Sequence, residues 1–194
     1  MGDAASMTPT THRQLDRLLA QARGLPAVRV AVVHPVDEPS LEGALTARDY
    51  GLIEPVLVGP ERKIRHCAET MGLSLDGVEL VDTEHSHAAA ETAVAMAARH
   101  EVAALMKGKL HTDELMHAVV ARAGGLRTGR RMSHVWAMDV PTYPRPLLIT
   151  DSALNIEPDL LAKADIVSNA IDMARALGVA EPRVAILSAT EEVN

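Results

Sequence analysis

Short apolar runs alternate with segments of helical periodicity along most of this chain. Four apolar runs, each expected to be a strand, lie at Val28–Val33, Pro55–Val58, Val78–Val81 and Val102–Met106. Between them, apolar residues spaced three and four apart predict helices, the first of which we expect Ser40 to cap. Repeated strand–helix units predict an α/β fold with a mostly parallel, doubly wound sheet and helices on both faces.

The pattern changes after the glycine pair at 124–125. A basic, glycine-broken loop is followed by a strand predicted over Ser133–Val140, and a proline-rich connection leads to a second over Leu147–Thr150. Prolines flanking short strands favour an antiparallel ribbon or a sheet edge. A helix is predicted to open at Pro158 and run to Leu177, and a last strand covers Val184–Leu187.

These changes of pattern predict three parts. Residues 1–26 form a flexible lead-in followed by a short helix, residues 27–125 a first α/β lobe, and residues 126–194 part of a second lobe. A chain of 194 residues is long enough for such a core, and hydrophobic residues make up 47% of it.

Composition excludes several classes of function. The single cysteine, Cys67, rules out an internal disulfide or a cysteine-rich metal site, and the histidines show no metal-ligand spacing, so we assign no metal. A net charge of -7 argues against a nucleic-acid surface. The chain has no apolar run long enough to span a membrane and no signal peptide, so we expect a cytoplasmic protein without a membrane partner.

The end of the fourth predicted strand is the strongest candidate site. Lys107, Gly108 and Lys109 follow the apolar run, and Thr112 is the predicted N-cap of the next helix. Two positive charges, a glycine that lets a ligand approach the backbone, and the free N–H groups of a helix start together favour an anion such as phosphate. The alternative is a solvated turn in which Thr112 only caps.

Three segments taken together resemble the phosphate acetyltransferase / phosphate butyryltransferase family. They are Leu105–Lys109, Gly125–Val135 and Ile149–Asp159, in the order and spacing of that family. The Met-Lys-Gly and Leu-Arg-Thr-Gly sequences within them are more similar to the butyryl branch. The resemblance implies a two-lobed fold like that of isocitrate dehydrogenase and, usually, a homodimer.

It also implies reversible acyl transfer between coenzyme A and inorganic phosphate, giving an acyl phosphate. This chemistry needs a base for the thiol, cations for phosphate and donors for an oxyanion. It needs no redox cofactor and no covalent enzyme intermediate, so we expect no cofactor, with coenzyme A as a substrate.

Nine residues fit those needs. We assign substrate binding to six residues and catalysis to three: Lys107, Gly108, Thr112, Arg130, Arg131 and Asn155 for binding, and Ser133, His134 and Asp151 for catalysis. The arginines supply a fork for phosphate oxygens. Each role has an alternative, because the arginines would equally pair with surface carboxylates, Asp151 would cap a turn that Asn155 holds, and His134 would be structural.

The resemblance also predicts a gap in the site. Family members continue beyond this point with an aspartate-glycine-proline segment and a serine-arginine and aspartate region credited with thiol activation, and neither has a counterpart here. We therefore expect a truncated second lobe and no turnover by these residues alone. A non-catalytic phosphate- or nucleotide-binding module remains an alternative, whereas a dehydrogenase is disfavoured because His34–Asp37 replaces a glycine-rich fingerprint after the first strand.

Overall fold

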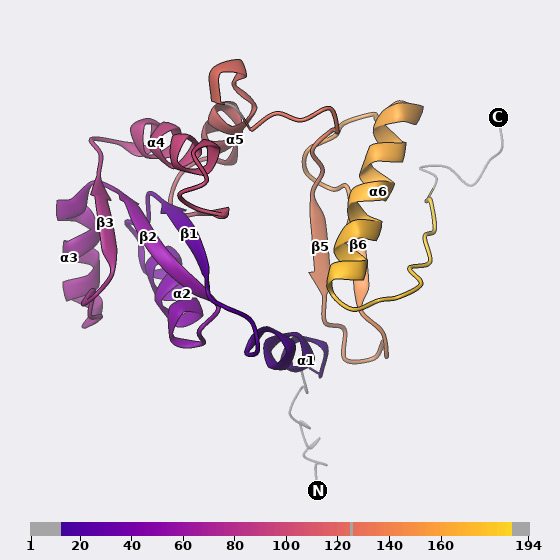
Figure 1. Ribbon diagram of the computed structural model, residues 1–194, viewed down its shortest axis with the longest axis horizontal. Helices are drawn as coiled ribbons and strands as arrows, with labels where there is room; N and C mark the ends of the chain where they lie inside the picture. The colour runs from indigo at the N-terminus through magenta and orange to yellow at the C-terminus, as the bar shows by residue number, and fades with distance from the viewer. Residues whose placement is uncertain (1–12, 125, 188–194) are drawn as a thin grey trace, which may run out of the picture. The chain divides into compact units, whose positions relative to one another are not determined.

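The computed structural model describes residues 13–124 and 126–187 (Figure 1). The described residues form two compact units, one within residues 21–128 and one that joins residues 13–20 with residues 129–187. The predicted flexible lead-in falls on residues 1–12, outside the described part of the chain. Within the two described ranges, no helix has the length and apolar character needed to cross a bilayer.

The unit of residues 21–128 is built on a four-stranded parallel sheet in the order β3-β2-β1-β4. The strands are β1 (Val28–Val33), β2 (Ile53–Gly59), β3 (Glu79–Asp82) and β4 (Ala104–Lys107). The two central strands are almost entirely apolar, as expected for strands that are covered on both faces. The predicted parallel, doubly wound sheet is confirmed.

Helices cover both faces of this sheet. Side chains alternate along β1, so Val32 packs with α2 (Glu38–Asp49) and α3 (Glu61–Met71). Its neighbour Val33 packs on the opposite face with α4 (Ser86–Ala98) and α5 (Thr112–Val120). A short 3-10 turn, η1 (Arg122–Gly124), follows α5. The sheet therefore lies between two apolar cores, one on each face.

Two helix starts in this unit differ from the predictions. Asp37 caps α2, and its side chain accepts from the Ser40 N–H, so Ser40 is already inside the helix. The N-cap of α5 is His111, and Thr112 is the first helical residue. Pro39 explains why α2 begins before Ser40: a proline fits the first turn of a helix, where its missing N–H costs no hydrogen bond. Asp37 therefore stands at the cap position instead of Ser40.

The other unit contains an antiparallel ribbon packed against a helix. Strands β5 (Val135–Met138) and β6 (Leu147–Thr150) pair along their whole length, as predicted, and β6 packs against α6 (Leu160–Ala176). The helix begins two residues later than the predicted Pro158, because the Asp159 side chain caps it by accepting from the Ala162 N–H at 2.7 Å.

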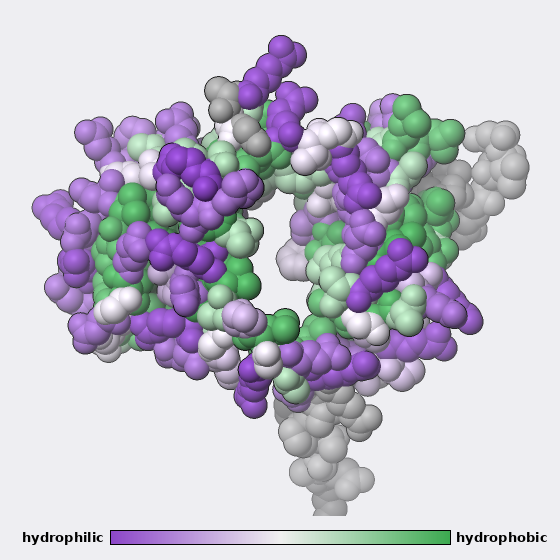
Figure 2. Space-filling view, in the orientation of Figure 1, coloured by the Kyte–Doolittle hydropathy of each residue, from purple (hydrophilic) through white to green (hydrophobic). Residues whose placement is uncertain are grey.

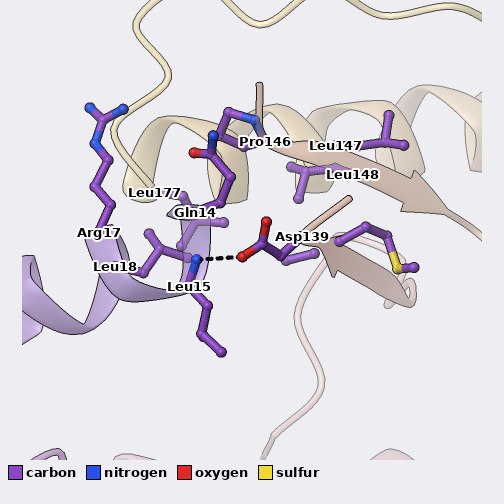
Figure 3. A pocket seen from close by; sticks show the side chains of 11 residues that line it. Gln14, Leu15, Arg17, Leu18, Asp139, Pro146, Leu147, Leu148 and Leu177 are labelled. Atoms are coloured by element: carbon purple, nitrogen blue, oxygen red, sulfur yellow. Dashed lines mark hydrogen bonds between the residues drawn. The ribbon is translucent and has the colours of Figure 1, made fainter. Parts of the chain in front are cut away.

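Helix α1 (Arg13–Ala22) contributes its first eight residues to this unit. The Leu15 N–H donates to the Asp139 carboxylate at 3.0 Å, and Leu18 lies near Leu148 and Leu177 in a small apolar pocket (Figure 3). The predicted short helix is thereby packed on the end of the ribbon.

The predicted last strand is wrong. Residues 184–187 form no strand, and the side chains of Ile186 and Leu187 are 76% and 89% exposed. An apolar run becomes a strand only by hydrogen bonding to a neighbour, and among residues 13–124 and 126–187 no strand pairs with this segment.

Candidate functional site

The Lys107–Lys109 turn lies at the topological switch point of the parallel sheet. Strand β1 has β2 on one side and β4 on the other, so the connections that leave β1 and β4 run to opposite faces. Ligands of open α/β sheets bind at the carboxyl ends of strands beside such a point. His34 follows β1 and Gly108 follows β4, which brings them together at this edge.

The backbone of β1 leaves no room for a side chain at Gly108. Its N–H donates to the Val33 carbonyl and the Lys109 N–H donates to that of His34, both at 2.9 Å. A Cβ on Gly108 would lie only 2.5 Å from the Val33 oxygen and 2.8 Å from the His34 oxygen. The expected close approach is therefore to β1, and contact of Gly108 with a ligand stays a prediction.

Lys107 and His34 hold the same turn. The Lys107 ammonium donates to the carbonyls of Leu110 and Gly108, at 2.9 and 3.2 Å. The Nδ1 atom of His34 lies 2.5 Å from the Lys109 carbonyl, which can only accept, so Nδ1 carries the proton. Lys107 thus stabilises the turn while placing its positive charge at the sheet edge.

The carboxylate of Glu114 caps the N-terminus of α5. Glu114 accepts from the His111 N–H at 2.8 Å and the Ser86 hydroxyl at 2.9 Å, and its carboxylate lies 3.0 Å from Nδ1 of His87. The bonds from His111 and Ser86 hold the pKa of Glu114 below its usual value, against the effect of burial. Since Glu114 occupies this helix start, Thr112 lacks the capping role from which its phosphate contact was inferred.

A second polar cluster forms in the unit of β5, β6 and α6. Val135 at the start of β5 pairs with Thr150 at the end of β6, so the residues just outside the two strands share one edge of the ribbon. The Thr150 hydroxyl donates to the His134 carbonyl at 2.6 Å. Antiparallel pairing therefore brings together two residues that are 16 positions apart in the sequence.

Asp151 organises the turn after β6. Its carboxylate accepts from the N–H groups of Ala153 and Leu154, both at 3.0 Å, and from the Asn155 side chain at 2.5 Å. Burial alone would raise the pKa of Asp151, but these bonds and the His134 N–H lower it below its usual value. Asp151 is an ionised, fully bonded acceptor, which fits the turn-capping alternative.

His134 faces a serine that the sequence analysis did not single out. Its Nδ1 atom lies 3.4 Å from the Ser152 hydroxyl oxygen, and its ring forms a T-shaped pair with that of Trp136, with centroids 4.9 Å apart. Ser152 follows Asp151 directly, and its position next to a predicted site residue was the only available signal. Both His134 and Ser152 reach the surface at the edge of the ribbon.

The two arginines differ in their surroundings. Arg130 forms a 2.7 Å ion pair with Asp172 and also donates to Asn169, so the surface-pair alternative holds for it. Arg131 donates to the Asn155 side-chain oxygen at 3.4 Å. Among the residues that the structure describes, no carboxylate lies within ion-pair distance of the Arg131 guanidinium. Arg131 therefore keeps the stronger capacity to bind an anion.

Helix α6 supplies residues that sequence reasoning missed. Asp165, Asn169 and Asp172 are spaced four and three apart and lie on one helix face. Asp165 accepts from the Arg131 N–H, and Asn169 donates to the Arg131 carbonyl and the Ser133 hydroxyl, all at 2.9 Å. The polar spacing of this stripe was a readable signal, but nothing in the sequence showed which segment it would face.

The structure thus groups the nine predicted residues into two sets. The unit of β5, β6 and α6 contains six of them, in the 130–134 segment and the turn after β6: Arg130, Arg131, Ser133, His134, Asp151 and Asn155. The unit of the parallel sheet contains the other three, at the β4 turn and the start of α5: Lys107, Gly108 and Thr112. Across the described residues, no three histidine, cysteine or acidic side chains cluster as metal ligands would.

Comparison with known proteins shows which family the chain resembles. The family model described as phosphate acetyl/butaryl transferase matches residues 86–194. A phosphate acetyltransferase of Rhizobium meliloti is 57% identical over 96% of this chain and 59% of its own length. A phosphate butyryltransferase of Clostridium beijerinckii is 34% identical over 94% of this chain and 60% of its own length. The expected closeness to the butyryl branch is therefore wrong.

Solved structures show the same fold. A branched-chain phosphotransacylase from Enterococcus faecalis V583 superposes with a TM-score of 0.70 at 24% identity, covering 86% of this chain and 58% of that one. A phosphotransacetylase from Streptococcus pyogenes gives a TM-score of 0.71 at 15% identity, covering 88% and 60%. The chain spans about three fifths of the length of these relatives.

Proposed function

Because this chain belongs to the phosphate acetyl/butyryl transferase family, we propose that it serves the reversible transfer of an acetyl group between coenzyme A and inorganic phosphate. Acetyl is proposed over butyryl because identity is 57% with the acetyltransferase of Rhizobium meliloti and 34% with the butyryltransferase of Clostridium beijerinckii. No cofactor is proposed, since coenzyme A enters as a substrate.

The observation that carries this proposal is the held segment 130–134. Arg131 has a guanidinium without a carboxylate partner among the described residues, and Ser133 lies two positions away on the same bonded segment. A guanidinium and a hydroxyl donor at fixed positions suit the oxygens of phosphate. The segment therefore serves as the phosphate-binding part of the site.

The remaining predicted residues take supporting roles in this proposal. Asp151 and Asn155 hold the turn beside Arg131, and His134 presents its ring beside Ser152 as a donor or acceptor for the substrate. In the other unit, Lys107 supplies positive charge at the edge of the parallel sheet, which by itself suits an anion such as phosphate. Each of these groups binds or orients a substrate without forming a covalent intermediate.

The proposal includes a cytoplasmic homodimer. Cross-strand neighbours Trp136 and Ile149 are 55% and 46% exposed, and hydrophobic residues reach the surface of this unit on the face shown in Figure 2. Exposed aromatic and aliphatic side chains on a ribbon favour association with a second copy. Coenzyme A and phosphate are small cytoplasmic metabolites, which fits the proposed compartment.

Thermal denaturation with coenzyme A tests the function. Binding to the native state raises the melting temperature by mass action, so coenzyme A at saturating concentration is expected to raise it, whereas NAD is not. In the same samples, acetyl phosphate is added and acetyl-coenzyme A is measured. Its formation supports transfer directly, and a shift without it shows that the chain binds coenzyme A. No shift with coenzyme A, or an equal shift with NAD, overturns the proposal.

A further inference from the structure

Asn169 lies at the centre of the polar stripe on α6 and contacts three residues of the basic segment. Its Oδ1 accepts from Arg130 at 3.3 Å, and its Nδ2 donates to the Arg131 carbonyl and the Ser133 hydroxyl oxygen, both at 2.9 Å. We propose that Asn169 is a positioning residue that turns the Ser133 hydroxyl into a hydrogen-bond donor for a bound phosphate. The inference rests on the proposed function of the 130–134 segment.

The orientation of the Asn169 amide is determined from both ends. The Arg130 guanidinium can only donate, so it must face the amide oxygen. The Arg131 carbonyl can only accept, so it must face the amide nitrogen. Both contacts require the same orientation of the amide, so its second N–H points at the Ser133 oxygen.

This orientation decides what Ser133 can do. A serine oxygen that accepts a hydrogen bond keeps its own O–H for another partner. With Asn169 donating to Ser133, the hydroxyl hydrogen is directed away from α6. The unprotonated oxygens of phosphate can only accept a hydrogen bond, so a serine fixed as a donor binds them better than one that is free to rotate.

The same helix also fixes Arg131. Its N–H donates to Asp165 at 2.9 Å, and its carbonyl accepts from Asn169 at 2.9 Å. With both backbone groups bonded to α6, the side chain of Arg131 starts from a defined position. Less ordering then accompanies anion binding, which raises affinity without any added contact to the ligand.

A double-mutant cycle with inorganic phosphate as the ligand tests this inference. The variants are Ser133→Ala, Asn169→Ala and the double variant, and phosphate affinity is measured by titration calorimetry on the full chain. Each single change is expected to weaken phosphate binding about tenfold, which is the size of one hydrogen bond to a charged group. The double variant is expected to be no weaker than the worse single variant, because Asn169 acts through Ser133.

A purely structural role for Asn169 would give a different pattern. The inference is overturned if the losses of phosphate affinity in the two single variants add in the double variant. It is also overturned if Asn169→Ala binds phosphate like the parent while Ser133→Ala binds it more weakly. Either result leaves the proposed function standing. Weak phosphate binding by the parent itself overturns both. If Asn169→Ala does not fold, the isosteric Asn169→Asp replaces it. Its oxygens can only accept, so Ser133 must turn inward, and Ser133→Ala is expected to add no further loss.

Discussion

The Asn155 side-chain amide donates to the carboxylate of Asp151, four residues before it, at 2.5 Å. The same amide donates to the Met132 carbonyl at 3.0 Å. One asparagine therefore connects the turn after β6 to the basic segment before β5. The ionised Asp151 carboxylate accepts this hydrogen bond more strongly than a protonated carboxyl group would, so the organisation of this site is sensitive to the charge of one carboxyl group.

The stabilising effect of Asp151 is expected to depend on pH. Its pKa is lowered in the folded protein, so the unfolded chain takes up a proton at higher pH than the folded chain does. The contribution to stability is therefore complete above the unfolded pKa of about 3.9 and is lost as pH falls through the folded value. Urea denaturation between about pH 3 and 6 should show Asp151→Asn to be less stable than the parent, with the difference shrinking toward low pH.

The matched control for this measurement is Asp76→Asn. Asp76 is exposed in the other unit, and its substitution is expected to leave the free energy of unfolding close to that of the parent. A constant difference for Asp151→Asn across the same range would contradict the account of its ionised state.

Gly108→Ala is expected to destabilise the parallel sheet. The added Cβ would meet the Val33 oxygen at 2.5 Å, and relieving this clash requires movement of backbone at the end of a central strand. We expect a loss of about 1–3 kcal/mol in the free energy of unfolding, measured in urea. Gly43→Ala is the control, because Gly43 is exposed inside α2 with open space at its Cβ, and it should gain up to about 1 kcal/mol. Equal effects of the two changes would contradict the packing argument.

Glu114→Gln is expected to lower the melting temperature. The change removes the negative charge of the Glu114 carboxylate, which accepts from the His111 N–H and the Ser86 hydroxyl and lies beside His87. These bonds join the N-terminal ends of α4 and α5, so the change weakens the contact between the two helices. Glu42→Gln, on the exposed face of α2, should leave the melting temperature nearly unchanged. A Glu114→Gln protein that melts with the parent would show that the two helix ends do not need this carboxylate.

Lys107→Ala is expected to reduce stability even without a ligand. The ammonium group bonds two carbonyls of its own turn, and losing hydrogen bonds from a charged donor costs about 1–3 kcal/mol. Lys109→Ala leaves both of those bonds in place and should cost less. The comparison is made by thermal denaturation in phosphate-free buffer. Equal melting temperatures for Lys107→Ala and the parent would mean that the turn is held by the Gly108 and His34 contacts alone.

Much of the fold was readable from the sequence because its signals are local. Continuous apolar runs bounded by glycine or proline located β1 and β2, and the proline-rich connection predicted the β5–β6 ribbon. The exceptions depend on partners. Residues 184–187 have the composition of a strand but no neighbour in the described structure, and the caps at Asp37 and His111 were decided by competition between adjacent residues.

The candidate site was only partly readable, for a physical reason. The family resemblance together with residue type pointed to Arg131, Ser133, Asp151 and Asn155. Hydrogen bonds connect Arg131, Asn155 and Asp151 directly, and Ser133 is connected to Arg131 through Asn169. The sequence did not distinguish Arg130 from Arg131, because that difference arises from Asp172, 42 residues further along the chain. The role of Asn169 was hidden for the same reason, since it depends on which segment packs against α6.

Titration of the chain with inorganic phosphate tests the central claim most directly. If the segment held on α6 is the phosphate-binding part of an acyltransferase site, calorimetry should show saturable binding that Arg131→Ala weakens about tenfold or more, because a guanidinium contact to a charged oxygen is lost. Arg145→Ala, an exposed arginine of the same unit outside the cluster, should bind phosphate like the parent. Absence of saturable binding, or equal affinity for the parent and Arg131→Ala, would contradict the account.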